Sequence, residues 1–273
     1  MTDVDHIVVS VNLAGLQSVV TVKLQRSMDV IRFARAGAHG VTEEAYESRS
    51  NSPLRVSPAA NFSLSLAAVR VASEEWYTLH VLRDAIDYIG TFLDEARVSC
   101  ALLALKLLPN AGLAEIQELE RDGAKFHKLG LPSKLDTLHA AYNVSATEAN
   151  YLLALNRARN CLVHRLGIVS SHDLSSADKM EVVWLGLRGA VTTVDGTRID
   201  SGITPTIPPG GKFELFRAEQ SREFSVGDKV TLSYDEMIAI MFTILAFVES
   251  FTLSVQLHGE RCGHEFAAPE TAT

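Results

Sequence analysis

An arginine and a histidine near the end of one predicted helix are the side chains of this sequence best suited to chemistry. Arg159 opens a run that reads Arg-Asn-Cys-Leu-Val-His, and His164 closes it. A guanidinium is always charged and presents a planar fork of donors that fits phosphate oxygens. An imidazole titrates near neutrality, so it can accept or donate a proton at physiological pH. The pair could hold a phosphodiester and move the protons needed to cleave RNA.

The helix that carries this pair is predicted from its two ends. Ser145 starts the sequence Ser-Ala-Thr-Glu, which has the form of a capping box, and Gly167 is expected to end the helix. On a helical wheel Arg159 falls in the middle of an apolar arc that consists of Leu152, Leu155, Leu162, Val163 and Leu166. An unpaired buried guanidinium is costly. We therefore expect Arg159 to face a carboxylate, a phosphate or a water-filled cleft.

Polar residues follow one flank of the same arc. Asn156, Asn160 and His164 recur every four residues, so they form a polar strip along the helix. We expect Asn160 to orient either the phosphate or the imidazole, while arginines beside the strip add local positive charge. The expected catalytic residues are Arg159, Asn160 and His164, and the expected substrate-binding residues are Arg157, Arg165 and Asn156. No carboxylates at metal-ligand spacing accompany them in sequence, so we predict neither a metal nor another cofactor.

The run from Arg159 to His164 resembles the signature of the HEPN superfamily, the helical domains of prokaryotic and eukaryotic nucleotide-binding and toxin systems. In that signature an Arg, a polar residue, about three variable residues and a His close a helix. The similarity extends loosely over Lys128–Leu135 before the helix and Gly167–Val169 after it. It implies a metal-independent endoribonuclease that leaves a 2′,3′-cyclic phosphate. It also implies a homodimer whose two motif helices build one composite cleft.

The spacing of the two residues also favours a dimer. Residues five apart on an α-helix point about 140° away from each other, so Arg159 and His164 of one chain cannot easily grip the same atom. A two-fold contact supplies each residue twice. We therefore predict a dimeric HEPN-like ribonuclease that acts on RNA, of the kind used as a toxin or antiviral defence effector. By analogy, an antitoxin or another regulatory protein is a further expected partner.

Other interpretations remain open at this point. A HEPN-like domain could use the motif for dimerisation, or to bind RNA or nucleotide without cutting it, and the chain could also be a purely structural helical protein. Arg159 could form a structural salt bridge to an acid on a neighbouring helix, such as Asp84, Asp87 or Asp94. His164 could merely cap helix carbonyls and complement the helix dipole.

Composition limits the classes of protein. A chain of 273 residues that is 47% hydrophobic can bury a core without disulfides or metal. Its net charge of −8 argues against a protein that coats long nucleic acid, although a local cleft remains compatible with it. Three cysteines without CxxC spacing, and a start without a basic signal region, predict a cytoplasmic protein. The apolar stretch Met237–Leu257 carries Glu249, so we expect no membrane segment.

The periodicity of apolar residues predicts a mainly α fold, a HEPN-like helical bundle with a small antiparallel β insert before the last helix. We expect an N-terminal helix and loop over residues 1–58 and the HEPN-like bundle over 59–273. Helices are predicted over 13–36, over 59–108 as two helices or one kinked helix, and over 113–127 and 132–142. The last helix starts at Ser233, with a second capping box, and is apolar on nearly all sides.

The β insert is expected over about residues 178–232. Its strands are predicted at 181–187, 190–197, 212–217 and 223–232, giving three or four antiparallel strands. Asp195-Gly196 is a strong turn signal within this region.

Overall fold

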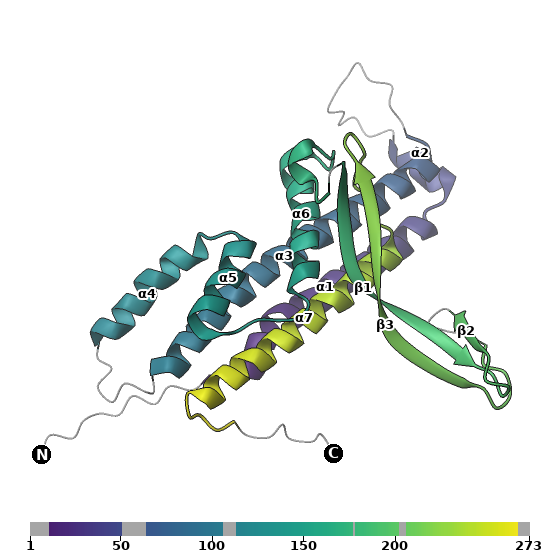
Figure 1. The fold of residues 1–273 in the computed structure, drawn as a ribbon. Coiled ribbons are helices and arrows are strands. Elements are labelled where there is room, and N and C mark those ends of the chain that lie inside the picture. Colours follow the sequence, from purple (N-terminus) through teal and green to yellow (C-terminus); the bar gives the residue numbers. More distant parts are fainter. Residues whose placement is uncertain (1–10, 51–63, 106–112, 177, 202–205, 267–273) are drawn as a thin grey trace, which may run out of the picture.

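The computed structural model describes residues 11–50, 64–105, 113–176, 178–201 and 206–266. These residues form a mainly helical fold with a three-stranded antiparallel sheet just before the last long helix, as predicted (Figure 1). The helices are α1 (Leu13–Gly40), α2 (Glu43–Ser50), α3 (Leu66–Leu105), α4 (Leu113–His127), α5 (Leu131–Tyr142), α6 (Ala149–Arg165) and α7 (Tyr234–Arg261), with a 3-10 turn η1 (Ser171–Asp173). The strands are β1 (Lys179–Thr192), β2 (Arg198–Ser201) and β3 (Lys212–Ser225).

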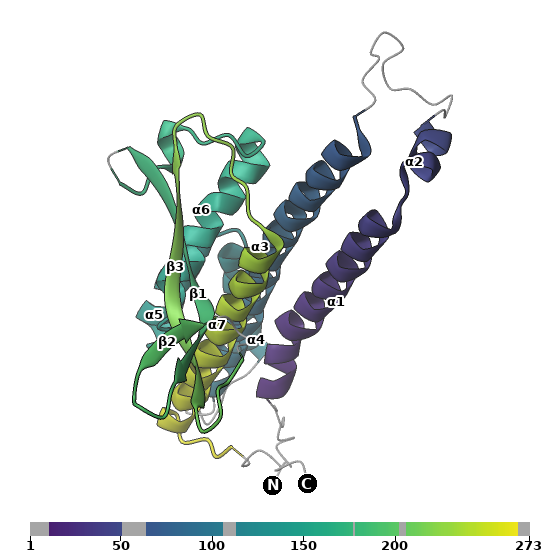
Figure 2. The ribbon, with the colours of Figure 1, turned by 90° about the vertical axis from the view of Figure 1, so that its right-hand side faces the viewer.

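Three long helices, α1, α3 and α7, pack lengthwise against one another (Figures 1 and 2). The central helix α3 runs for 40 residues without a break, where the sequence left two helices or a kink open. Its Phe92 packs edge-on against Phe247 and Phe251 of α7, and all three rings are fully buried. From α1, Leu16, Val20, Leu24 and Ile31 join the same core.

The last helix begins as the sequence predicted. The Ser233 hydroxyl accepts a hydrogen bond from the Glu236 backbone N–H, and the Glu236 carboxylate accepts one from the Ser233 N–H. By length and composition α7 could cross a membrane, since its most apolar window has a mean hydropathy of 2.0, but 56% of that window is buried inside the fold. The core helix of a protein outside the membrane can have the same length and composition, so the absence of a membrane segment stays a prediction.

The sheet has the strand order β2-β1-β3 and is antiparallel throughout. The long partners β1 and β3 pair from Lys179 opposite Ser225 to Thr192 opposite Lys212. Of the three or four strands predicted, the described residues form three, because the stretches at 181–187 and 190–197 do not give two strands: β1 runs through both as far as Thr192, before the turn at Asp195-Gly196. The prediction of a strand through 232 was also wrong, because β3 ends at Ser225. One end of the hairpin lies along the helices, and the other, with β2, projects away from them (Figure 1).

Helix α6, which carries the motif, lies between α3 and β1. Its buried side chains are Leu152, Ala154, Leu155, Ala158 and Cys161. The predicted capping box at Ser145 was wrong. The Ser145 N–H donates to the Ser254 hydroxyl of α7 (3.1 Å), and the helix starts later, after Glu148, whose side chain does not cap it. The predicted exit is confirmed, because the Gly167 N–H donates to the Cys161 carbonyl in the helix-closing bond.

Candidate functional site

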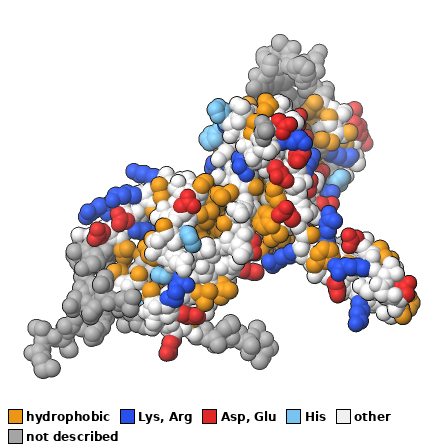
Figure 3. Space-filling model, in the orientation of Figure 1, with side chains coloured by type: hydrophobic (Ala, Val, Ile, Leu, Met, Phe, Trp, Pro, Cys, Tyr) orange, Lys and Arg blue, Asp and Glu red, His pale blue; other side chains and the backbone are white. Residues whose placement is uncertain are grey.

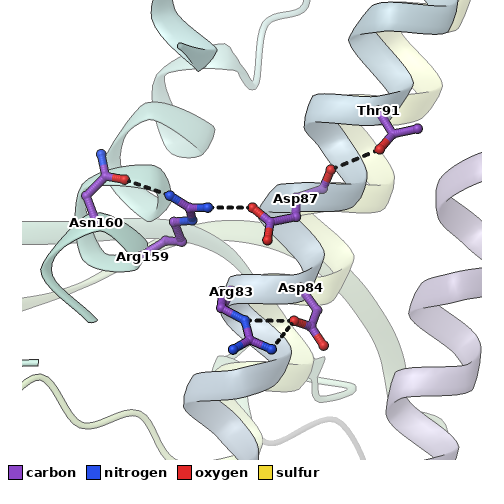
Figure 4. A network of polar contacts seen from close by, with 6 residues as sticks. All are labelled: Arg83, Asp84, Asp87, Thr91, Arg159 and Asn160. Atoms are coloured by element: carbon purple, nitrogen blue, oxygen red, sulfur yellow. Dashed lines mark hydrogen bonds and ion pairs between the residues drawn. The ribbon is translucent and has the colours of Figure 1, made fainter. Parts of the chain in front are cut away.

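Arg159 projects from α6 towards α3 and meets a carboxylate there (Figure 4). Its Nη2 lies 2.7 Å from Oδ1 of Asp87, and its Nη1 donates to the Asn160 side-chain oxygen at 3.2 Å. The Arg159 side chain is 24% exposed and that of Asp87 48% exposed, so the ion pair sits at the rim of the helix interface. The expectation that Arg159 faces a carboxylate is confirmed. The acid is Asp87, one of the three aspartates that were expected to pair with Arg159 if it formed a structural salt bridge.

The guanidinium of Arg159 is only partly used by these contacts. A guanidinium has five N–H donors, and the two hydrogen bonds to Asn160 and Asp87 occupy two of them. Its Nε is buried and has no hydrogen-bond partner among the described residues. The outer Nη hydrogens therefore remain able to bind an anion that approaches from the rim.

Asn160 and Arg159 are brought together by the structure, whereas His164 stands apart from them. His164 is exposed in the last turn of α6. Within the described part of the chain, no hydrogen bond joins its ring to Arg159 or Asn160. Arg159 and His164 lie five residues apart on the continuous helix α6, a spacing that turns their side chains about 140° away from each other.

The apolar arc predicted on the helical wheel is covered in part, and Leu162 near its end is half-buried against the core. Leu152 and Leu155 are fully buried, but Val163 is 41% exposed and Leu166 is 87% exposed. For these two residues the prediction of a core-facing arc was wrong, because the fold covers the Ala158 and Cys161 side of the helix instead. Figure 3 shows hydrophobic side chains at the surface around the upper end of α6, where histidine side chains also reach the surface.

Arg165, predicted to bind substrate, holds a carboxylate of its own chain. Its Nε donates to Oδ2 of Asp173 at 2.8 Å, and its Nη2 is in still closer contact with Oδ1. Asp173 is buried and also accepts hydrogen bonds from the Ser170 N–H and hydroxyl. Burial opposes ionisation of Asp173, but the hydrogen bonds from Arg165 and Ser170 outweigh it and lower the pKa of this carboxyl. The pair fixes the exit of α6 against the turn η1, which gives Arg165 a structural role.

The remaining predicted substrate-binding residues, Asn156 and Arg157, are half-buried on α6. The Nε of Arg157 is buried without a hydrogen-bond partner among the described residues. Nearby, the Tyr151 hydroxyl donates to the Glu219 carboxylate of β3, which ties the start of α6 to the sheet. Among the described residues, no hydrogen bond joins the side chain of Asn156 or Arg157 to that of Arg159.

Cys161 lies inside the motif but faces the core. Its side chain is fully buried, and burial raises the pKa of its thiol. A thiol nucleophile needs a lowered pKa and access to solvent, so Cys161 is a packing residue. Among the described residues, no group of three or more His, Cys, Asp or Glu side chains is placed to hold a metal ion.

Sequence reasoning missed the role of Asp173, although a local signal for it exists. Ser170 and Asp173 have the spacing of a capping box, and the structure forms both of its hydrogen bonds. An acid fixed in this way eight residues after Arg165 is a natural ion-pair partner for it. By contrast, the choice of Asp87 depends on which side of α3 meets α6, a contact between residues 72 positions apart in sequence.

The comparisons with known proteins give no relative. No protein-family model matches the chain, and no curated protein or solved structure is significantly similar to it. The function must therefore be argued from the residues of α6 and their surroundings.

Proposed function

We propose that this chain is a HEPN-like, metal-independent endoribonuclease that cleaves RNA at a cleft formed between the α6 helices of two copies. The observation that carries this proposal is the uncovered end of α6. Val163 and Leu166 are exposed on either side of His164, and Leu166 is held with a positive φ of 54°, which disfavours a side chain. A second copy docking there would cover these apolar side chains and bring its own motif to the first.

Arg159 is suited to hold the scissile phosphate. Asp87 and Asn160 hold its guanidinium at the rim of the helix interface, and these two hydrogen bonds leave other Nη hydrogens unused. A preorganised cation of this kind stabilises the negative charge that develops on a phosphate in the transition state. Asn160 keeps the guanidinium oriented through the hydrogen bond between their side chains.

His164 supplies the proton transfer. One imidazole accepts the proton of the ribose 2′-hydroxyl as the 2′-oxygen forms its bond to phosphorus. The bond from phosphorus to the 5′-oxygen breaks, and this leaving oxygen takes a proton from solvent, to which the imidazolium afterwards releases its own proton. The products are a 2′,3′-cyclic phosphate and a free 5′-hydroxyl. Because the nucleophile belongs to the RNA, the chain needs to supply only charge stabilisation and proton transfer.

A second copy supplies what one chain lacks. Arg159 and His164 diverge by about 140° around α6, so a site needs Arg159 from one copy and His164 from the other. As a ribonuclease of this kind, the protein would act in the cytoplasm as a toxin or antiviral defence effector. An antitoxin or regulatory protein would restrain it by covering the α6 surface, which consists of the exposed residues Val163, His164 and Leu166.

The second candidate function is a non-catalytic HEPN-like domain that dimerises or binds RNA or nucleotide through the same helix. The ion pair between Arg159 and Asp87 favours it, because a carboxylate of the same chain already neutralises the cation that should meet the phosphate. In that case Arg159 fixes α6 against α3 and performs no chemistry.

Complementation between two inactive variants tests the proposal. Arg159→Ala and His164→Ala are purified separately, mixed under conditions that allow subunit exchange, and assayed for RNA cleavage in EDTA. A mixed dimer has one site with both residues intact, because the missing groups fall together in the other site. Cleavage should return to between a quarter and a half of the wild-type level. If each variant alone and the mixture all cleave RNA like the wild type, the ribonuclease proposal is wrong.

The matched control for this experiment is His139→Ala. His139 is also an exposed histidine in the last turn of a helix, α5, and lies outside the motif. This variant should cleave as the wild type does, alone and in mixtures. Inactive variants whose mixture stays inactive, despite proven exchange, would contradict the site shared between two chains.

A further inference from the structure

One face of α1 carries large apolar side chains that the described chain leaves uncovered. Val22 is 65% exposed and Phe33 is 82% exposed, whereas the opposite face of the same helix is buried in the core. Between these two residues lie the exposed side chains of Arg26 and Asp29. Their neighbours Gln25 and Val30 are exposed on the same part of α1. An exposed apolar patch with charges set into it is typical of a protein contact surface.

The pattern of this face is complementary to itself. Consider two copies of α1 lying antiparallel across a two-fold axis that passes midway between Ser27 and Met28. Val22 of each copy then lies opposite Phe33 of the other, and Arg26 lies opposite Asp29. Apolar side chains therefore meet apolar ones, and opposite charges meet in the centre. A parallel arrangement would instead place Arg26 beside Arg26 and Asp29 beside Asp29, which is repulsive.

The residues near the two ends of α1 are compatible with the same antiparallel arrangement. Ser18 lies opposite Gly37, and Gly15 opposite Gly40, so small residues face each other near both ends of the contact. Gly37 and Gly40 have open space where a side chain would stand. The helix has 28 residues and is about 42 Å long, and the axis lies close to its midpoint. Almost the whole of α1 can therefore pack against its mate.

We propose that a second copy of this chain docks on α1 through this antiparallel two-fold contact, with the surface defined by Val22, Arg26, Asp29 and Phe33. The charge complementarity of the register is the argument for a second copy rather than another partner. Figure 2 shows α1 and α6 on opposite sides of α3, so this contact leaves the α6 surface free. A chain that uses both surfaces assembles into more than two copies.

Charge reversal tests the register. Arg26→Asp places two acids opposite each other in the pair, and Asp29→Arg places two arginines opposite each other. Each variant alone should weaken self-association through α1 at least tenfold and halve the mass measured by light scattering. An equimolar mixture should recover the wild-type mass, because acids of one variant then face arginines of the other. Phe33→Ser, at a position that is 82% exposed, should halve the mass without loss of helicity by circular dichroism.

The control is Arg121→Asp, which reverses an exposed arginine on α4 and should leave the mass unchanged. Single variants that keep the wild-type mass, or a wild-type chain that is monomeric at the highest concentration, overturn the proposal. Single variants that lose mass but do not recover it on mixing overturn the antiparallel register. Since these measurements record mass alone, they are independent of whether the protein cleaves RNA.

Discussion

Truncation of Arg159 should cost the protein little stability but nearly all of its cleavage. The Arg159–Asp87 pair is 2.7 Å long, yet almost half of the Asp87 side chain is exposed, so solvent screens the attraction. Pairs of this kind contribute about 0–1 kcal/mol. We expect Arg159→Ala to lower the free energy of unfolding by about 1 kcal/mol, which corresponds to a fall in Tm of about 2–4 °C for a chain of this size.

The effect on catalysis should be larger. Removal of a preorganised cation from a developing phosphate charge reduces the rate by about 10²-fold or more. That factor corresponds to about 2.7 kcal/mol in the activation free energy, well above the stability change. If Arg159 belongs to the site, its removal therefore changes the cleavage rate more than the stability. If Arg159 is only structural, its removal changes the stability more.

The assay is a double-mutant cycle of Arg159→Ala and Asp87→Ala, with melting temperature and RNA cleavage measured for each variant. The coupling in stability should be below about 1 kcal/mol. The control is Arg83→Ala, which breaks the exposed pair between Arg83 and Asp84 on α3, one turn away (Figure 4). It should lower Tm by a similar amount and leave cleavage unchanged. Normal cleavage by Arg159→Ala, together with a fall in Tm above about 10 °C, would refute this reasoning and favour a structural salt bridge.

Four further predictions concern the surroundings of the motif and the buried cysteines. Leu166→Asp should leave Tm unchanged, since the side chain is 87% exposed, but should weaken association through α6 as seen by light scattering. Arg165→Ala leaves the buried Asp173 carboxylate unpaired and should cost about 3 kcal/mol in urea unfolding. Because the folded pKa of Asp173 is lowered from 3.8, its stabilisation is present at neutral pH and lost on acidification below that value; Asp173→Asn should flatten this dependence. The three buried cysteines should resist a thiol reagent until the protein is denatured.

The helices could be predicted because their signals are local. Periodic apolar residues and the capping box at Ser233 mark α7 in the sequence, and Pro132 with the preceding Gly130 marks the start of α5. These features act within one or two turns of a helix, so tertiary contacts rarely override them. The prediction of a mainly helical bundle with a β insert before the last helix was correct for this reason.

The errors arose where distant residues decide the local structure. Ser145 has the spacing of a capping box, but its N–H bonds to Ser254, and α6 starts later as a result. Strands β1 and β3 are continuous because they pair with each other along 14 residues each. The local sequence of either strand does not indicate this pairing. The helical periodicity of α6 predicts an apolar arc. It does not predict which residues of that arc a neighbouring helix or strand covers. The partner of Arg159 could be narrowed to three acids but not chosen among them.

The central claim is that α6 carries a metal-independent RNA-cleaving site, and the most direct test is the chemistry of the product ends. Purified protein is incubated with RNA in EDTA, and the ends of the fragments are identified for the wild type, His164→Ala and the His139→Ala control. The account predicts fragments with 2′,3′-cyclic phosphates from the wild type and the control, and at least about 10²-fold slower cleavage by His164→Ala. Cleavage by His164→Ala at the wild-type rate, or no cleavage by a folded wild-type protein that associates through α6, would contradict it.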